Sequence, residues 1–392
     1  MVWLLINIAK FIFITTNQKM IQIPMSVRDA DECVPYFLMI KDDLYKNFVA
    51  FWTNHQRFST KCIPETCSKI FVVDGHQKAN RLVCQYKNVF DCTISELGPV
   101  QMGCLYSPLR KGTFQKYLYV FRFIYICNIA PGTDHRYCQQ HQPTTPTSGN
   151  RITNLIQQIV EDDKEQVLDK LALIDYINND GQYDDKLCNV FRSGANIKCK
   201  VSTYGFLATF LSCGVIVGFT EQPCSEGSKC ELHCFTLRII NIFLHFIIKI
   251  IVRRVLHHIL TIMRFGQLPT AMCYDCACTL KLFIRRHFGT EDLKSTDFTK
   301  FITSLTMAVD RFHVKNHTRS MCKTIMRPDH PSHNDIFASI NTQVAEQMFS
   351  YFSQFKQSFR GYNYPKSTIF YTILFHLKNC KTTGISSYSQ AL

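Results

Sequence analysis

Short apolar runs that end in an acidic residue recur along the chain. Ile70–Val73 is followed directly by Asp74, and Ala271–Tyr274 is followed in the same way by Asp275. Continuous apolar runs of this length are typical of buried strands. A side chain at the carboxyl end of such a strand lies at the open edge of an α/β sheet, where ligands and metals bind. The pattern predicts two strands that each bring an aspartate to that edge.

The region between these two strands has the pattern of a hairpin and a covering helix. Residues 201–211 and 213–221 are extended apolar runs with little between them, as in an antiparallel hairpin. Ile239–Leu260 is also apolar, but charged and histidine side chains interrupt it at His245, Lys249, Arg253, Arg254, His257 and His258. These interruptions favour a buried or half-buried helix over a transmembrane one.

Two further elements follow Asp275. Residues 307–313 predict another short strand, and Asn341–Phe349, which contains Glu346, has helical spacing. The full order is a strand with an aspartate, a hairpin, a helix, a second strand with an aspartate, and then helices. This order predicts an α/β fold with a ribonuclease-H-like mixed sheet, flanking helices and a Cys/His zinc-binding insertion after the first strand.

Shifts in composition divide the chain into segments. We expect an apolar leader at 1–25 that is not native, because Met20 and Met25 offer later starts. The other predicted segments are a helical lead-in at 26–69, the first part of the core at 70–103, the zinc-binding insertion and linker at 104–150, an acidic amphipathic helix at 151–187, the rest of the core at 188–380 and a short tail at 381–392.

Composition indicates a globular protein with an excess of positive charge. Apolar residues make up 46% of the chain and charged residues 19%, and 44 Lys+Arg against 30 Asp+Glu give a net charge of +14. That excess suits a nucleic acid first and an acidic membrane surface second, although charge that serves solubility alone is equally compatible. Membrane association is the weakest interpretation, because charges interrupt both apolar stretches. The oligomeric state is not indicated, and a homo-oligomer stays open.

Nineteen cysteines, an odd number in a long chain, favour a reducing compartment and zinc over a disulfide scaffold. The clearest zinc pattern is Cys127 followed by Cys138 and His141 as C-x-x-H. Cys104 is the natural fourth ligand of a tetrahedral site, and Cys84 or Cys92 could replace it.

Two weaker metal patterns accompany this one. His313, His317 and Cys322 form H-x3-H-x4-C, a spacing compatible with a second zinc and equally with core histidines. Cys62 and Cys67 could bind a metal only with partners that the sequence does not identify.

The acidic residues predict a second kind of metal chemistry. Asp74 and Asp275 at strand ends, with Glu346 on a helix, are what two divalent cations need for in-line phosphoryl transfer. Asp310 is assigned to structure rather than to this cation pair. No phosphate-binding loop, nucleophile elbow or dinucleotide fingerprint occurs in the chain.

Several of these motifs resemble the Kyakuja-Dileera-Zisupton (KDZ) transposases. The resemblance covers about residues 35–378 and is carried by VVDGHQKANRLVC, GPVQMGC, CNIAPGTDHRYCQQH, CGVIV, YDCAC, DRFHVKNHTRSMC and NTQVAEQMFSYF, which occur in the family's order. It implies a ribonuclease-H-like fold, nuclear cut-and-paste transposition of double-stranded DNA, and Asp74, Asp275 and Glu346 as catalytic ligands of Mg²⁺ or Mn²⁺. It also implies that the Cys/His elements are structural zinc sites.

The chain departs from the family at both ends. N-terminal DNA-binding and cysteine-cluster modules are missing or shortened, and the sequence stops soon after the Glu346 segment. These departures suit a truncated or domesticated copy. The alternative to an active transposase is therefore a catalytically decayed, zinc-stabilised DNA-binding protein.

Overall fold

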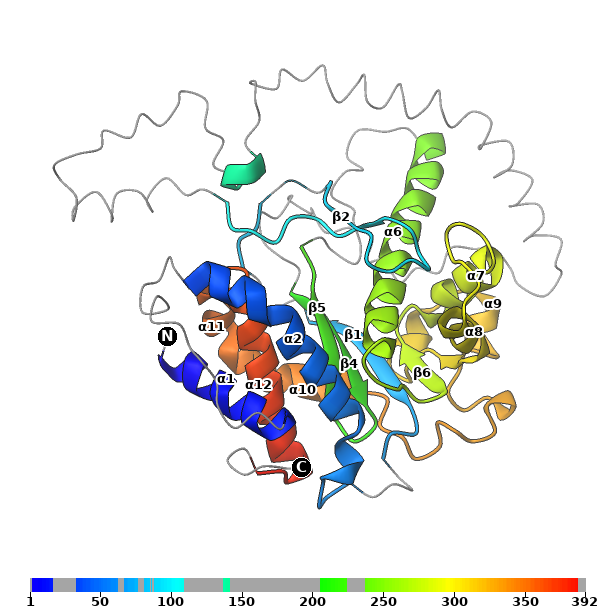
Figure 1. Cartoon of the computed structure of the whole chain (residues 1–392). Helices are drawn as coiled ribbons and strands as arrows, with labels where there is room; N and C mark the ends of the chain where they lie inside the picture. Colours follow the sequence, from blue (N-terminus) through cyan, green and yellow to red (C-terminus); the bar gives the residue numbers. More distant parts are fainter. Residues whose placement is uncertain are drawn as a thin grey trace.

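The computed structural model describes residues 2–16, 33–62, 67–76, 81–84, 86, 88–108, 137–141, 205–223 and 237–386, with the backbone alone for 237–248. A five-stranded mixed sheet lies at its centre, in the order β5-β4-β1-β6-β7 (Figure 1). Its strands are β1 (Phe71–His76), β4 (Phe206–Leu211), β5 (Ile216–Glu221), β6 (Ala271–Tyr274) and β7 (Thr306–Ala308). A separate ladder pairs β2 (Phe90–Asp91) with β3 (Val100–Gln101).

Helices cover both faces of the sheet. They are α1 (Val2–Thr15), α2 (Cys33–Thr53), α6 (Leu237–Met263), α7 (Ala277–His287), α8 (Asp297–Ser304), α9 (Ser320–Lys323), α10 (Val344–Phe352), α11 (Lys356–Gly361) and α12 (Lys366–Thr383). Short 3-10 helices are η2 (His55–Arg57), η3 (Gln139–His141), η5 (His313–Asn316), η6 (Pro331–His333) and η7 (Ser353–Phe355). Figure 1 shows α1, α2 and α12 gathered on one side, while α7, α8 and α9 lie beyond β6.

The strands differ in direction, and this decides what lies at each edge. β1, β6 and β7 run parallel, whereas β4 is antiparallel to both β1 and β5. Every residue of β4 and β6 is buried, as expected for strands covered on both faces. The carboxyl ends of the three parallel strands therefore meet at one edge of the sheet.

One face of the sheet packs against α6. His258 of α6 places Nε2 2.8 Å from Thr209 Oγ1 and Nδ1 2.8 Å from Thr220 Oγ1. Gly218 of β5 has no room for a side chain, because a Cβ atom there would lie 2.4 Å from Ile262. The close approach of α6 to the hairpin thus depends on a glycine.

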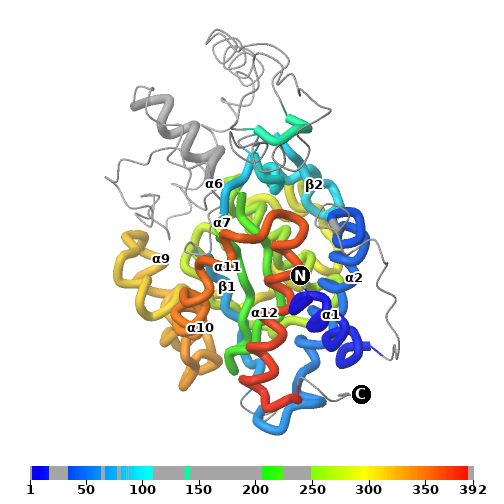
Figure 2. Tube along the Cα trace, turned by 90° about the vertical axis from the view of Figure 1, so that its left-hand side faces the viewer, coloured from blue at the N-terminus to red at the C-terminus, as the bar shows by residue number. Residues whose placement is uncertain are grey.

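The opposite face is filled by aromatic rings from α10, α11 and α12. Phe206 of β4 contacts Phe349, Phe359 and Phe375, whose ring centroids lie 5.0–6.2 Å away. Figure 2 shows α10 and α12 side by side along the sheet. At the sheet's β5 edge, the Asn379 amide of α12 accepts from the Ile216 N–H and donates to its carbonyl. The Asn379 side chain thus satisfies backbone groups of the edge strand that a further strand would otherwise pair with.

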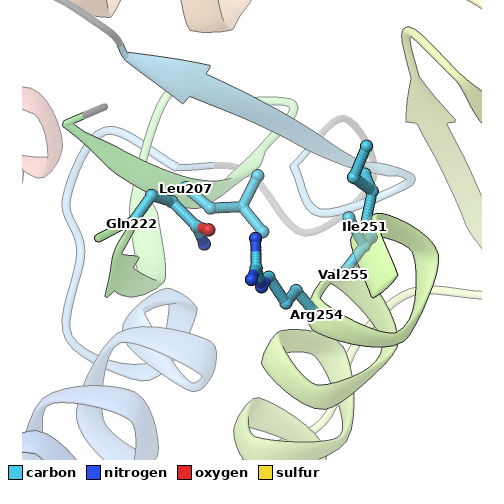
Figure 3. A pocket seen from close by; sticks show the side chains of 5 residues that line it. All are labelled: Leu207, Gln222, Ile251, Arg254 and Val255. Atoms are coloured by element: carbon cyan, nitrogen blue, oxygen red, sulfur yellow. The ribbon is translucent and has the colours of Figure 1, made fainter. Parts of the chain in front are cut away.

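Basic side chains of α6 fasten the segment that contains β2 and β3. Arg254 Nε donates to the Gln101 carbonyl at 2.7 Å, and His257 lies 3.3 Å from Asp91. Arg254 also faces Leu207 across a crevice between α6 and the hairpin (Figure 3). The crevice has no room for a water molecule, so it is too small to be a ligand site.

Within the described residues the structure confirms the predicted hairpin, covering helix and second aspartate strand, and it changes the bounds of β1 and β7. The hairpin is β4–β5, the covering helix lies within α6, Ala271–Tyr274 is β6, and β7 is shorter than the predicted strand at 307–313. β1 continues through Asp74 to His76, because it remains paired with β4 after its pairing with β6 has ended at Val73.

Several predicted segments fall wholly or partly outside the described residues. The acidic helix at 151–187 lies wholly outside them, as do most of the insertion and linker at 104–150 and the end of the tail. Parts of the leader, the lead-in and the two core segments are also outside them. Residues 2–15 of the expected leader form α1, which buries Leu4, Ile8 and Phe11. Among the described helices, none combines the length and apolarity needed to cross a membrane.

We predict that acid destabilises this fold partly through His376. Its ring packs between Phe11 and Trp52, and burial lowers its pKa from 6.5 to about 3. A depressed histidine pKa contributes stability above pH 6.5, and this is lost as the pH falls toward 3. His376→Phe should therefore remove about 1.6 kcal/mol of the stability loss between pH 6.5 and pH 5.

Urea unfolding at a series of pH values measures this effect. The buried His258, whose pKa burial also lowers to about 3, stays in the variant and should leave a residual acid slope. If the free energy of unfolding falls by the same amount in the wild type and in His376→Phe as the pH is lowered, this role of His376 is wrong.

Candidate metal centres

The register of the parallel strands aligns three aspartates with one another, just beyond the last parallel pairs of the sheet. The last β1–β6 pair is Val73 with Tyr274, so Asp74 and Asp275 come next on their strands. The last β6–β7 pair is Cys273 with Ala308, and two residues further on Asp275 corresponds to Asp310. All three aspartates thus follow the parallel pairing at the carboxyl edge of the sheet.

These aspartates also belong to the face that α10 covers. Side chains alternate along a strand, so Asp74 shares a face with His76. The His76 ring stacks on Phe349 of α10, with centroids 4.6 Å apart. Glu346 lies one turn before Phe349 on the same helix. The fold therefore brings a helix glutamate to the aspartates, as the sequence predicts.

Three of the four carboxylates converge on one nitrogen atom. His313 Nδ1 lies 3.0 Å from Asp275 Oδ1 and 3.8 Å from Glu346 Oε1, and it makes a short contact with Asp310 Oδ2. Ligand atoms of Asp275, Asp310 and His313 all lie within 4.8 Å of one another. We call Asp275, Asp310, His313 and Glu346 the acid cluster. Asp74 Oδ1 accepts a hydrogen bond from the Gly75 N–H at 2.7 Å.

Burial and mutual repulsion set the charges of the acid cluster. Burial raises the pKa of Asp275 to about 6, and the Asp310 carboxylate adds to this rise while His313 opposes it. Hydrogen bonds to Asp275 and Asp310 raise the pKa of His313 to about 11. Burial raises the pKa of Glu346, whereas bonds from His313 and Asp275 outweigh burial and lower that of Asp310. At neutral pH an imidazolium therefore sits among carboxylates.

Asp310 makes structural contacts, but it also belongs to the group of side chains that could hold a metal ion, to which the sequence did not assign it. Its Oδ1 accepts from the N–H groups of Phe312 and His313, at 2.7 and 3.1 Å, and this turns the chain after β7. Its position beside Asp275 could have been found by aligning Asp74, Asp275 and Asp310 as strand-end acids. The sequence offers no signal that His313 turns toward them.

A Cys/His cluster lies at the predicted insertion. Cys104 Sγ is 3.9 Å from Cys138 Sγ, and His141 Nδ1 is 3.3 Å from Cys138 Sγ and 3.7 Å from Cys84 Sγ. The N–H groups of Tyr86 and Cys138 donate to Cys84 Sγ, as is common around metal-bound thiolates. Cys84, Cys104, Cys138 and His141 thus provide a complete tetrahedral ligand set that could hold zinc.

This cluster uses three of the four predicted ligands. Cys104, Cys138 and His141 come together as expected, and Cys84, one of the two alternatives named from the sequence, joins them. Cys127 lies outside the described residues.

A second Cys/His cluster lies next to the acid cluster. His317 Nδ1 is 3.3 Å from Cys322 Sγ and 3.6 Å from Cys278 Sγ, and all three residues are buried. His313, predicted to share this site, instead contacts the acids. Cys278, three residues after Asp275 at the start of α7, is the member that sequence spacing did not indicate. The group could hold a metal such as zinc, with three protein ligands.

Comparison of the chain with protein-family models, with curated proteins and with solved structures gives no match. Functional inference therefore depends on the geometry of the chain itself.

We predict that Cys84→Ser and Cys138→Ser each release one zinc ion per chain and lower the melting temperature. Structural zinc contributes on the order of 10 kcal/mol to folding in small zinc domains, so a lost thiolate should be costly. Elemental analysis and thermal unfolding measure both effects. Cys92→Ser, which alters an exposed thiol, is the matched control and should change neither. Well-folded wild-type protein that contains no zinc would contradict the prediction that this cluster binds zinc.

Proposed function

We propose that the protein is a metal-dependent DNA-cleaving enzyme of the KDZ transposase type, with a ribonuclease-H-like core. The observation that carries the proposal is the convergence of Asp275, Asp310 and Glu346 on one point, with Asp74 at the same register. The order of the sheet supports it too, because an antiparallel hairpin is followed through a helix by parallel strands that carry the acids.

The donor set of the acid cluster fits a hard divalent cation. Carboxylate oxygens are the ligands that Mg²⁺ and Mn²⁺ prefer, and clustered carboxylates repel one another until a cation or proton neutralises them. Asp74, Asp275 and Glu346 would hold the cations, and Asp310 would position His313 and the turn after β7. A bound cation pair would supply an activated water and stabilise charge on the reacting phosphate.

The surface beside the acid cluster suits a nucleic-acid strand. A hollow of about 260 Å³ is lined by Arg311, Phe312, Lys315, Ile340, Asn341, Thr342 and Gln343. Phe312 is 58% exposed, so its ring is open to stacking on a base, and Lys315 is exposed for a phosphate. With a net charge of +14, the chain has the electrostatic character that DNA binding requires.

We predict that Asp275→Asn lowers Mg²⁺-dependent nicking of supercoiled plasmid by more than about 100-fold, since even outer-shell changes at metal sites cost 10–100-fold. The amide keeps the shape of the side chain but removes a negative ligand. Zinc content, melting temperature and DNA affinity should stay near those of the wild type. Asp297→Asn, at a fully exposed carboxylate on α8, is the matched control and should cleave normally.

The same assay separates the roles of the two neighbouring acids. Asp74→Asn should abolish nicking, whereas Asp310→Asn should reduce it less, because Asp310 acts through His313 and the turn. Loss of cleavage in Asp310→Asn together with its retention in Asp74→Asn would mean that the cation pair is held by Asp275 and Asp310 instead.

The second candidate function is zinc-stabilised DNA binding without cleavage. It is favoured by the raised pKa of His313, because an imidazolium already neutralises part of the acid cluster without a metal. Wild-type protein that binds DNA and never nicks it, with Mg²⁺ or with Mn²⁺, would establish this alternative.

We predict that affinity for duplex DNA falls steeply as salt rises, with little dependence on sequence. Lys315→Gln should weaken binding and reduce the slope of log K against log [salt] by about 0.9, the value for one lost phosphate contact. Lys381→Gln is the matched control, because the end of α12 lies by the β4–β5 turn, at the opposite edge of the sheet. Fluorescence anisotropy at several salt concentrations measures both. A flat salt dependence, or tighter binding to anionic vesicles, would contradict the proposal.

A further inference from the structure

Another group of metal-ligating side chains lies where β1 begins, at the opposite edge of the sheet from the acid cluster. It consists of His55, Cys62, Cys67 and Cys213, and one ligand atom from each lies within 4.8 Å of the others. We propose that these four residues bind a structural Zn²⁺ ion. We call them the β1-entry cluster; the inference does not depend on the proposed function.

The members come from three separate parts of the chain. His55 opens η2 just after α2, Cys62 and Cys67 precede β1, and Cys213 lies in the turn between β4 and β5. Cys62 and Cys67 form a cysteine pair whose metal-binding partners cannot be identified from the sequence. The fold supplies those partners, since Leu211 pairs with Phe71 and the Ser212 N–H donates to the Ile70 carbonyl at 3.2 Å.

The distances in the β1-entry cluster approach those of a tetrahedral site. His55 Nε2 lies 3.2 Å from Cys67 Sγ and 3.4 Å from Cys213 Sγ. Zinc bonds of about 2.3 Å to sulfur and about 2.0 Å to nitrogen separate tetrahedral ligand atoms by about 3.5–3.8 Å. All three cysteines are free thiols rather than disulfides. Small adjustments of side chains would therefore complete the coordination.

The surroundings orient the ligands as in known zinc sites. His55 Nδ1 lies 2.8 Å from the Trp52 carbonyl, which can only accept, so Nδ1 carries the hydrogen and Nε2 presents its lone pair to the thiols. Ser68 Oγ is 3.2 Å from Cys67 Sγ, and Ser59 Oγ accepts from the Cys62 N–H at 2.9 Å. Hydrogen bonds of this kind orient the side chains that bind a metal.

The donor set identifies the chemical class of the ion. Three thiolates and one imidazole are soft and borderline ligands, which select Zn²⁺ and exclude Mg²⁺. His55 is fully buried and Cys67 is 5% exposed, so four protein ligands would close the site against substrate. A zinc ion here would tie α2, the start of β1 and the hairpin together, and would thereby hold the strand that carries Asp74.

Zinc counting in the full chain tests the proposal. Cys213→Ser should lower the zinc content found by native mass spectrometry by one ion per chain. The loss should be additive with that caused by Cys138→Ser. Cys380→Ser is the matched control, because Cys380 is a buried thiol 3.5 Å from His376 Nε2 that belongs to no such group among the described residues. An unchanged zinc count in folded Cys213→Ser would overturn the proposal.

Cysteine alkylation of the wild-type protein tests the same site without a substitution that could prevent folding. Cys62 is only half-buried, so as an ordinary thiol it would react with iodoacetamide, as the exposed Cys92 should. With bound zinc, Cys62, Cys67 and Cys213 should resist alkylation, and a mild chelator should make Cys62 reactive while Cys380 stays unmodified. Equal alkylation of Cys62 before and after chelation, or a disulfide between any two of the three cysteines, would overturn it.

Discussion

The parallel register of β1, β6 and β7 is the constraint on which the candidate site depends. Each strand is a short apolar run that ends near an aspartate, and parallel pairing aligns these ends at one edge. Alignment places like charges close together, which is unfavourable unless a proton or a cation neutralises them. His313 meets part of that demand, since its Nδ1 contacts three carboxylates at once.

The remaining architecture keeps that register in place. α6 and the aromatic side chains of α10, α11 and α12 cover the two faces of the sheet, so the strands that carry the acids are fixed by packing rather than by the acids themselves. Cys278 and Cys322 lie near Asp275 and Asp310 in the chain, and metal binding there would fasten the segments that follow both aspartates. Packing of the sheet thus does not depend on Asp275, which is why Asp275→Asn should spare the fold, whereas Asp310 also turns the chain after β7.

Local sequence patterns located the buried strands of the central sheet, because a fully buried strand needs a continuous apolar run, but they missed β2 and β3 and extended β7 too far. Ala271–Tyr274 and the hairpin are examples of strands located in this way. Patterns also predicted Asp275 and Glu346, whose positions follow from one strand and one helix. The patterns did not predict metal ligands that come together only through long-range contacts. Cys278, Cys213 and His55 meet their partners in the folded chain, and no spacing rule connects residues so far apart in sequence.

His313 shows the same limit in another form. Its spacing to His317 suggests a shared metal site, but the 3-10 turn after Asp310 directs the two rings to different clusters. Two residues four apart lie on the same face only in a regular α-helix. Here the N–H groups of Phe312 and His313 donate hydrogen bonds to the Asp310 carboxylate, and the chain makes a tighter turn.

Calorimetric titration of the wild type with Mn²⁺ at pH 7, in two buffers of different ionisation heat, tests the central claim most directly. If the acid cluster is a cation site neutralised by His313, Mn²⁺ should bind and release up to one proton per chain. His313→Gln should still bind but should release fewer protons, and Asp275→Asn should bind far more weakly. Absence of Mn²⁺ binding to the wild type, or equal binding to Asp275→Asn, would contradict the claim.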